Sequence, residues 1–479
     1  MSVATPHLTL LDESDLRRVR DGVSHVLATV GAAYGSERAR ELLRDAGCDV
    51  DDETGVALIP RELTERTISQ LDDRVLLAGR DPRHDVVLDG TSTHLMTAGV
   101  CPHIVDLETG EHREPALRDV EQAGRVVDAL DEIPLCFFLF LPSADVPPQT
   151  SDLATLACLL GATGKHIFGE LITPQDARYA LEMVRVAAPD ADPRERPIFS
   201  TIYNPISPLQ HEKNALDAAM LLVESGIPQN IYAGPLSGAT GPMTLAGTMV
   251  QTVAEELSAA VVFKLLREDC SLILSSNAGI MDMASAQDSI SSPETMLLNN
   301  ALTEVIHSLG APALSAGYAI DAWDLGTFRA GVESMGLALV TRLARPDISA
   351  GAGGFDAVET ASLAKLVLDA EVARESDRVA AGIGMDDDHL ALDVIAAVGP
   401  GGQYLAEDHT VRHLRDGEHW MPKVLARSTR TSGSPNAVEL AAARARKIVE
   451  THEAAPLPDG AAERIADILA EVAAEHGVS

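Results

Sequence analysis

The chain has 479 residues, of which 46% are hydrophobic, and a formal net charge of -35 at pH 7. Such a charge disfavours nucleic acid as a partner, because phosphates are bound by Lys and Arg. No apolar run approaches the roughly 20 residues of a membrane helix, and the acidic N-terminal stretch lacks the apolar segment of a secretory signal. We therefore expect a cytoplasmic protein that binds neither nucleic acid nor membrane, with its five cysteines reduced.

Arginine strongly outnumbers lysine, since only six of the 37 basic residues are lysine. An acidic surface that is poor in lysine suits a cytoplasm of high salt, where the repulsion between like charges is screened. A genome whose codons favour arginine would explain the shortage equally well. Adaptation to salt is therefore a hypothesis here.

The first part of the chain has helical spacing over residues 12–45 and 60–71. Residues 86–115 then alternate between apolar and polar, with Asp-Gly and Thr-Gly turns, which is typical of hairpins. A further helix is predicted over 117–130. We interpret residues 1–130 as an N-terminal extension of helices and hairpins.

From residue 134 onward, short apolar segments alternate with helical ones at a spacing of about 30 to 40 residues, as parallel β-α-β units require. This pattern predicts a (β/α)8 TIM barrel over residues 131–385, although only seven strands can be placed. An open, doubly wound sheet is the alternative, but no G-x-G-x-x-G turn supports a dinucleotide-binding version. Residues 386–479 are predicted to form helices that pack on the barrel. The predicted strands are 135–141, 166–171, 197–203, 229–233, 271–275, 312–316 and 347–350.

The stretch from Ile231 to Glu256 runs from an apolar strand through a loop rich in glycine into a long helix. Pro242 suits the first turn of that helix, and apolar residues every four positions predict one buried face. In barrel proteins, loops of this kind at the carboxyl ends of strands hold ligands.

The predicted strand ends carry aromatic, amide and hydroxyl groups with a few carboxylates, and no lysine. Aromatic faces beside a carboxylate favour a small organic cation, although each ring taken singly is more often part of the core. Motifs of zinc proteases, α/β-hydrolases and P-loop proteins are absent. Farther on, His409 and His413 are interpreted as residues of a helix surface or cap rather than as metal ligands.

Two long motifs resemble the trimethylamine methyltransferase (MttB) family. The first is Gly238-Ala-Thr-Gly-Pro-Met-Thr-Leu-Ala-Gly247, followed by Gln251 and Ala254-Glu255. The second runs from Lys365-Leu-Val-Leu-Asp369-Ala-Glu371 to Val398-Gly-Pro-Gly-Gly402-x-Tyr-Leu405 and His409-Thr410. The likeness spans nearly the whole chain.

The resemblance implies a barrel methyltransferase that moves a methyl group from a methylated amine to the cobalt of a corrinoid (cobalamin) carried by a separate protein. Founding members contain pyrrolysine, which this chain lacks. The region from Asp321 to Glu333 also departs from the family pattern, with Trp323 in place of a lysine. These features resemble the glycine betaine branch of the family, whose substrates are quaternary amines.

Roles for individual residues follow from the resemblance and from their places at strand ends. Tyr203, Tyr318, Trp323 and Phe355 are expected to form the walls that face the cation, and Asn204 and Arg329 to receive a substrate carboxylate. Asp321, Glu333 and Glu255 are expected to act as catalytic or orienting polar groups. Gly234, Gly238, Thr240 and Gly241 are expected to form the rim that the corrinoid approaches.

We expect no metal bound by this chain itself, and a homo-oligomer. Two other functions stay open at this point. One is a barrel enzyme of different chemistry, such as a lyase or hydrolase, that does not use a corrinoid. The other is a non-catalytic binder of quaternary amines.

Overall fold

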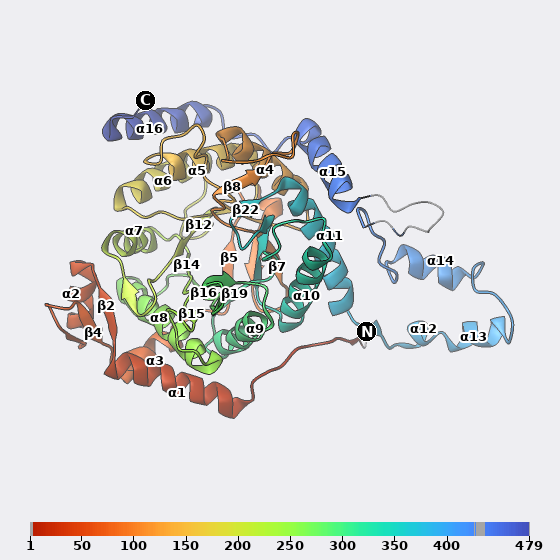
Figure 1. The fold of residues 1–479 in the computed structure, drawn as a ribbon, viewed down its shortest axis with the longest axis horizontal. Helices are drawn as coiled ribbons and strands as arrows, with labels where there is room; N and C mark the ends of the chain where they lie inside the picture. The colour runs from red at the N-terminus through yellow and green to blue at the C-terminus, as the bar shows by residue number, and fades with distance from the viewer. Residues whose placement is uncertain (1–2, 426, 428–435, 479) are drawn as a thin grey trace.

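A closed barrel of eight parallel strands forms the centre of the computed structural model, which describes residues 3–425, 427 and 436–478 (Figure 1). A helix follows each strand in the chain and lies outside the barrel, so the predicted (β/α)8 fold is confirmed. The strands, in order around the barrel, are β7 (His94–Thr97), β10 (Leu135–Phe137), β11 (His166–Gly169), β12 (Phe199–Tyr203), β14 (Gln229–Ile231), β16 (Leu272–Ser276), β19 (Ala313–Ala316) and β20 (Ile348–Ala352). The helices that follow them are α4 (Leu117–Ala129), α5 (Ser151–Ala162), α6 (Pro174–Ala187), α7 (Lys213–Glu224), α8 (Leu245–Leu266), α9 (Pro293–Ser308), α10 (Phe328–Ala344) and α11 (Leu363–Ala380).

The strand that the sequence pattern does not place is β7, and it is the first in the chain rather than the last. It pairs in parallel with both β10 and β20 and so closes the barrel. The barrel therefore begins near His94, upstream of the expected boundary at residue 131. A hairpin over this strand was the wrong expectation. The hairpin does occur just downstream, where β8 (His103–Val105) pairs antiparallel with β9 (His112–Arg113).

The amino-terminal end of the barrel is plugged by a second hairpin, formed by β5 (Val75–Leu77) and β6 (Val86–Leu88). Val75, Leu77 and Leu88 of this hairpin are buried in one cluster with Leu135 and Phe168 from the barrel interior. With this end closed by apolar packing, the opposite end, at the carboxyl termini of the strands, is where a ligand can enter.

The N-terminal extension covers the outer side of α8. Its helices α1 (Glu13–Thr29) and α3 (Arg61–Ser69) pack on α8, and the hydroxyl of Tyr34 donates to the carbonyl oxygen of Ser258, 2.9 Å away. The sequence predicts a single buried face for this helix, but residues on all its sides are buried. Consequently, Glu255 and Glu256 are both inside the protein. The small sheet of the extension contains β2 (Ala32–Tyr34), β3 (Asp49–Val50), β4 (Val56–Leu58) and, from the barrel, β13 (Gln210–His211), with helix α2 (Glu37–Asp45) beside it.

The predicted C-terminal helices form two groups. Helix α15 (Ala437–Thr451) packs on α11 and α4, and α16 (Ala461–His476) packs on α6 and α5. Between α11 and α15, the helices α12 (Asp387–Leu390), α13 (Leu392–Val398) and α14 (Asp408–Arg415) extend away from the barrel (Figure 1). The strands β1 (Val3–Ala4) and β23 (Ile383–Gly384) pair at the base of this arm. In the described ranges, no helix has the length and apolar character needed to cross a bilayer.

Candidate active site at the barrel mouth

A cavity of about 330 Å³ lies at the carboxyl ends of the barrel strands; we call it the mouth cavity. Small-molecule sites span roughly 300 to 1,000 Å³, so this one suits a small ligand. Alternation along the strands decides which side chains reach it. Ile202 and Asn204 line the cavity, whereas Tyr203 between them does not. Its polar and aromatic lining consists of Thr97, Phe137, Glu170, Asn204, Tyr232, Asn277 and Asp288.

Two carboxylates give the mouth cavity its electrostatic character. Burial raises the pKa of Glu170, while a hydrogen bond from Asn204 Nδ2 to Glu170 Oε1, 2.5 Å long, opposes the shift. Burial, and then the nearby charge of Asp321, raise the pKa of Asp288 to about 6. No Lys, Arg or His lines the cavity within the described part of the chain. When both carboxylates are ionised, the cavity therefore favours a cation.

Two aromatic rings stand beside these carboxylates. Tyr232 is partly buried, and its desolvation raises its phenol pKa; Asn277 lies with it in the lining of the cavity. The ring of Phe137 passes so close to Gly99 that a Cβ there would lie 1.8 Å from Phe137 Cε1, so only glycine leaves room for the ring. Aromatic faces next to buried carboxylates are the groups that hold a quaternary or methylated ammonium.

Most of the aromatic residues expected to face the ligand lie elsewhere. Tyr203 is buried outside the barrel, where its hydroxyl is 2.7 Å from His211 Nδ1 and its ring stacks on that histidine. Tyr318 is also buried outside the barrel, in one hydrophobic cluster with Leu366 and Val367 of α11. Of the expected substrate-binding residues, only Asn204 lines the mouth cavity.

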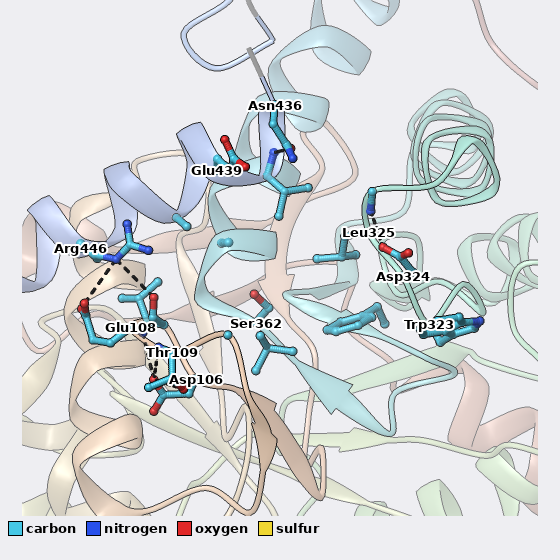
Figure 2. A pocket seen from close by; sticks show the side chains of 18 residues that line it. Asp106, Glu108, Thr109, Trp323, Asp324, Leu325, Ser362, Asn436, Glu439 and Arg446 are labelled. Atoms are coloured by element: carbon cyan, nitrogen blue, oxygen red, sulfur yellow. Dashed lines mark hydrogen bonds and ion pairs between the residues drawn. The ribbon is translucent and has the colours of Figure 1, made fainter. Parts of the chain in front are cut away.

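Trp323 and Phe355 line a different hollow of about 750 Å³, which we call the side groove (Figure 2). Figure 2 shows it between the turn around Glu108, the loop that carries Trp323, and helix α15, from which Arg446 reaches Glu108. Trp323 is 72% exposed. The side groove contains a basic side chain, Arg446, and its buried carboxylate, Asp106, is paired with Arg113. The described lining of the mouth cavity has no basic side chain, so we take the mouth cavity as the candidate site.

Asp321 acts on the mouth cavity without lining it. Its carboxylate accepts hydrogen bonds from Ser289 Oγ (2.9 Å), the amide of Ile290 (3.0 Å) and Ser291 Oγ (2.8 Å). These contacts fix the segment that presents Asp288 and Ile290 to the cavity. Asp321 is therefore a positioning residue, and its charge also contributes to the raised pKa of Asp288.

Glu333 and Arg329 are paired with each other at the start of α10. Glu333 Oε1 accepts from Arg329 Nε at 2.5 Å, and Glu333 Oε2 accepts from the amide of Ala322 at 2.8 Å. The Arg329 side chain is largely exposed. Glu333 thus holds the loop that follows Asp321, and Arg329 lies outside the mouth cavity.

Glu255 holds the turn that follows Asn204. Its Oε2 accepts from Ser207 Oγ at 2.7 Å, and its Oε1 accepts from the amide of Leu209 at 3.0 Å and from Gln251 Nε2 at 2.8 Å. Burial raises the pKa of Glu255 and these hydrogen bonds oppose the shift. Its neighbour Glu256 is fully buried and accepts from the amide of Ser275, which ties α8 to β16.

The glycine loop is built as a turn anchored to α8. Gly238 has φ of 89°, a left-handed conformation that favours glycine, and the Thr240 hydroxyl accepts from the amide of Leu236 at 2.9 Å. Gln251 also donates to the carbonyl oxygen of Thr240 at 2.7 Å. The motif residues Thr240, Gln251 and Glu255 therefore form one network, which links the glycine loop to the turn after Asn204. At the other positions, Gly234 lies beside Asn277 of the cavity, and Gly241 lies against Thr248 of α8.

The site residues to which sequence reasoning assigned no role are Phe137, Glu170, Tyr232, Asn277 and Asp288. Phe137 reads as core, and Asp288 lies in an excursion after β16 that carries no motif. Glu170 lies at the end of one predicted strand and Asn277 just beyond another, so their positions were the available signal. Choosing Tyr232 over Tyr203 requires knowing which face of each strand looks inward.

Fold and cavity together define a TIM-barrel protein whose mouth cavity carries two carboxylates and, in its described lining, no basic side chain. The family model "Trimethylamine methyltransferase (MTTB)" matches residues 1–477. The trimethylamine methyltransferase MttB of Desulfitobacterium hafniense (strain DSM 10664 / DCB-2) is 30% identical over 472 residues, covering 98% of this chain and 94% of that protein. The chain belongs to the trimethylamine methyltransferase family.

Two other relatives give the range of similarity. The glycine betaine methyltransferase of Desulfitobacterium hafniense (strain Y51) is 26% identical over 430 residues, covering 89% of each chain. Among solved structures, the monomethylamine methyltransferase MtmB of Methanosarcina barkeri matches with a TM-score of 0.49 and 13% identity, over 92% of this chain and 94% of that chain.

Proposed function

We propose that this protein transfers a methyl group from a quaternary ammonium compound to the cobalt of a corrinoid carried by a separate protein. The observation that carries the proposal is the lining of the mouth cavity, where Glu170 and Asp288 stand beside Phe137 and Tyr232 without any basic side chain. Family membership supplies the reaction class. The acidic lining of the cavity indicates that the substrate is positively charged.

The charge of the substrate simplifies the chemistry. When a methyl group leaves a quaternary nitrogen, the C–N bond electrons stay on nitrogen and the product is a neutral tertiary amine, so no acid has to protonate the leaving group. The reduced corrinoid of the partner would supply the nucleophile. The task of this chain is then to hold the cation in one orientation and to exclude water. The carboxylates and aromatic faces of the mouth cavity would perform that task.

The lining of the cavity says less about the rest of the substrate, beyond its ammonium group. A glycine betaine-like compound is what the resemblance implies, and its carboxylate would need donors. Arg329, the expected partner of that carboxylate, is paired with Glu333 outside the cavity. Within it, the amides of Asn204 and Asn277 are the available donors, and Asn204 already donates to Glu170. A quaternary amine with an uncharged tail therefore fits better than glycine betaine itself.

The loops around the mouth cavity offer a surface for the corrinoid partner. Each of these loops follows a barrel strand and exposes an apolar side chain, and the exposed fraction reaches 67% at Met243 and 89% at Phe328. Met243 and Met283 lie against Gly238, so the glycine loop supports this surface. Exposed apolar patches of this kind are typical of protein–protein contacts. The surface consists of Ile172, Ile206, Met243, Met283, Trp323 and Phe328.

The decisive assay measures methyl–cobalt formation from a panel of choline, tetramethylammonium, carnitine, glycine betaine and trimethylamine. We expect transfer from one or more of the quaternary amines, both to a corrinoid protein and to free cob(I)alamin. Met243→Asp and Phe328→Asp should reduce transfer to the corrinoid protein and leave transfer to free cob(I)alamin unchanged. Tight binding of a quaternary amine without methyl–cobalt would instead favour a non-catalytic binder.

We also propose that the chain works as a homo-oligomer. The projecting arm exposes large apolar side chains, including Leu392 (68% exposed) and Leu405 (84%), and a second copy would cover them. Light scattering coupled to size exclusion should give a mass above 50.6 kDa. Leu405→Asp should lower that mass, whereas Val30→Asp, on the surface of the extension, should not.

A further inference from the structure

The projecting arm has no hydrophobic core of its own. None of the described residues in α12, α13 and α14 is buried. The helices are also short, with 4, 7 and 8 residues, and helices of this length are not stable alone in water. The contact between α12 and α14 therefore depends on polar groups.

Those polar groups are histidines and carboxylates. Asp388 and His389 from α12 meet His409 and His413 from α14. His409 and His413 are four residues apart on one face of the helix, with ring centroids 4.1 Å apart. In each of two overlapping triads, one ligand atom per residue lies within 4.8 Å of the others; the triads are Asp388, His409 and His413, and His389, His413 and Glu418.

Neighbouring groups already orient the first triad. Arg412 donates to Asp388 Oδ1 at 2.5 Å, which leaves Oδ2 directed toward His413. His409 Nε2 lies 3.0 Å from the carbonyl oxygen of Asp388. In the tautomer that donates this hydrogen bond, His409 Nδ1 keeps its lone pair. Contacts of this kind fix the rings of histidines that bind metals.

A buried atom without a partner points to the ligand. His413 Nε2 is buried and has no hydrogen-bond partner, although Asp388 Oδ2 is only 3.2 Å away. An isolated buried nitrogen is unfavourable. A single metal ion bound between His413 Nε2 and Asp388 Oδ2 would give both atoms a partner.

We propose that Asp388, His409 and His413 bind a divalent transition metal of the Zn²⁺ class. Imidazole with carboxylate is a ligand set that suits Zn²⁺, whereas Ca²⁺ and Mg²⁺ prefer oxygen alone. The metal would join α12 to α14 and supply the stability that the arm lacks in apolar packing. This inference departs from the sequence expectation of no metal and of surface histidines, because the third group, Asp388, comes from a separate helix.

The experiment uses the full chain without an affinity tag, stripped by a chelator and titrated with Co²⁺ or Zn²⁺ alone. Co²⁺ should give visible absorption bands of a four-coordinate site at one equivalent. His413→Ala and Asp388→Asn should weaken binding by at least about tenfold. His25→Ala, which removes an exposed histidine of α1, is the matched control and should bind as the wild type does.

Limited proteolysis gives a second readout that is independent of methyl transfer. Zn²⁺ should slow cleavage between residues 391 and 407 in the wild type and in His25→Ala, but not in His413→Ala, whose circular dichroism should show an intact barrel. The proposal is overturned if the wild type binds no metal at micromolar concentrations. It is equally overturned if His413→Ala and Asp388→Asn retain wild-type affinity.

Discussion

Lys365 and Asp369 form a buried ion pair one turn apart on α11, with Lys365 Nζ 2.5 and 2.7 Å from the two carboxylate oxygens. Lys365 also donates to the carbonyl oxygen of Tyr318 at 3.0 Å, and Asp369 accepts from the amide of Gly353 at 2.8 Å. The pair therefore holds the two loops that follow β19 and β20. Ala319 of the first loop and Gly351, near the end of β20, line the mouth cavity.

Removing one member of this pair should destabilise the protein strongly. Asp369→Ala leaves the ammonium of Lys365 buried without its carboxylate, and we expect the free energy of unfolding to fall by about 3–5 kcal/mol. Denaturant unfolding measures this change. Lys213→Met breaks an exposed pair with Asp217 at the same spacing, and it should change stability little. Equal effects of the two substitutions would contradict the role given to the buried pair.

Binding of a cation in the mouth cavity should depend on pH. The pKa of Asp288 is raised to about 6, and only its ionised form attracts a cation. Affinity for tetramethylammonium, which does not titrate, should rise up to about tenfold per pH unit below pH 6 and level off above it. Calorimetry from pH 5 to 8 checks this. Asp288→Asn should weaken binding at pH 7.5 and flatten the profile, whereas Asp324→Asn, in the side groove, should alter neither.

The two hollows can be told apart by their aromatic residues. Tyr232→Leu should weaken binding of tetramethylammonium by about 0.5–2 kcal/mol, or roughly 2- to 30-fold in Kd, because the cation loses an aromatic face. Tyr232→Phe keeps the ring and should cost less. Trp323→Ala should leave the affinity unchanged, since the indole lies in the side groove. The opposite ranking would move the site to the side groove.

Glu255 should matter for structure more than for charge. Glu255→Ala leaves the amide of Leu209 and the Gln251 side chain without their acceptor, so we expect a loss of about 1–3 kcal/mol in stability. Glu255→Gln keeps one oxygen and should lose less. Thermal unfolding measures both, with the exposed Glu62→Ala as the control. A stable Glu255→Ala protein that binds substrate but transfers no methyl would instead support a catalytic role.

The acidic composition makes a separate prediction about salt. If it reflects adaptation to a salty cytoplasm, the melting temperature should rise between low salt and molar KCl, as the repulsion among excess carboxylates is screened. Choline chloride is unsuitable as the comparison salt because it is a candidate substrate. A melting temperature that does not change with KCl would leave codon usage as the explanation for the few lysines.

The barrel could be predicted because buried parallel strands leave a simple trace, a short apolar run repeated at a fixed spacing. Seven of the eight strands leave it. β7 does not, because it begins with His94 and lies next to a stretch in which apolar and polar residues alternate. The same stretch does form a hairpin a few residues later, so local pattern could not separate the two outcomes.

The site was harder to predict because it depends on the direction in which each side chain points, and not only on its position at a strand end. Tyr203 and Asn204 are neighbours at the end of β12, yet one packs against α8 and the other lines the cavity. Asp288 reaches the cavity through contacts that Asp321 makes from 30 residues away or more, a relationship that no local pattern carries. Sequence reasoning found Asp321 and missed the residue that it positions.

The absence of a basic side chain from the described lining of the mouth cavity has a consequence for turnover under the proposed function. Demethylation converts a permanently charged substrate into a neutral amine at the moment of transfer. Glu170, Asp288 and the two aromatic faces then lose the charge that they were holding, so the product binds more weakly than the substrate did. The electrostatics that select the substrate would therefore favour departure of the product for as long as the amine stays unprotonated.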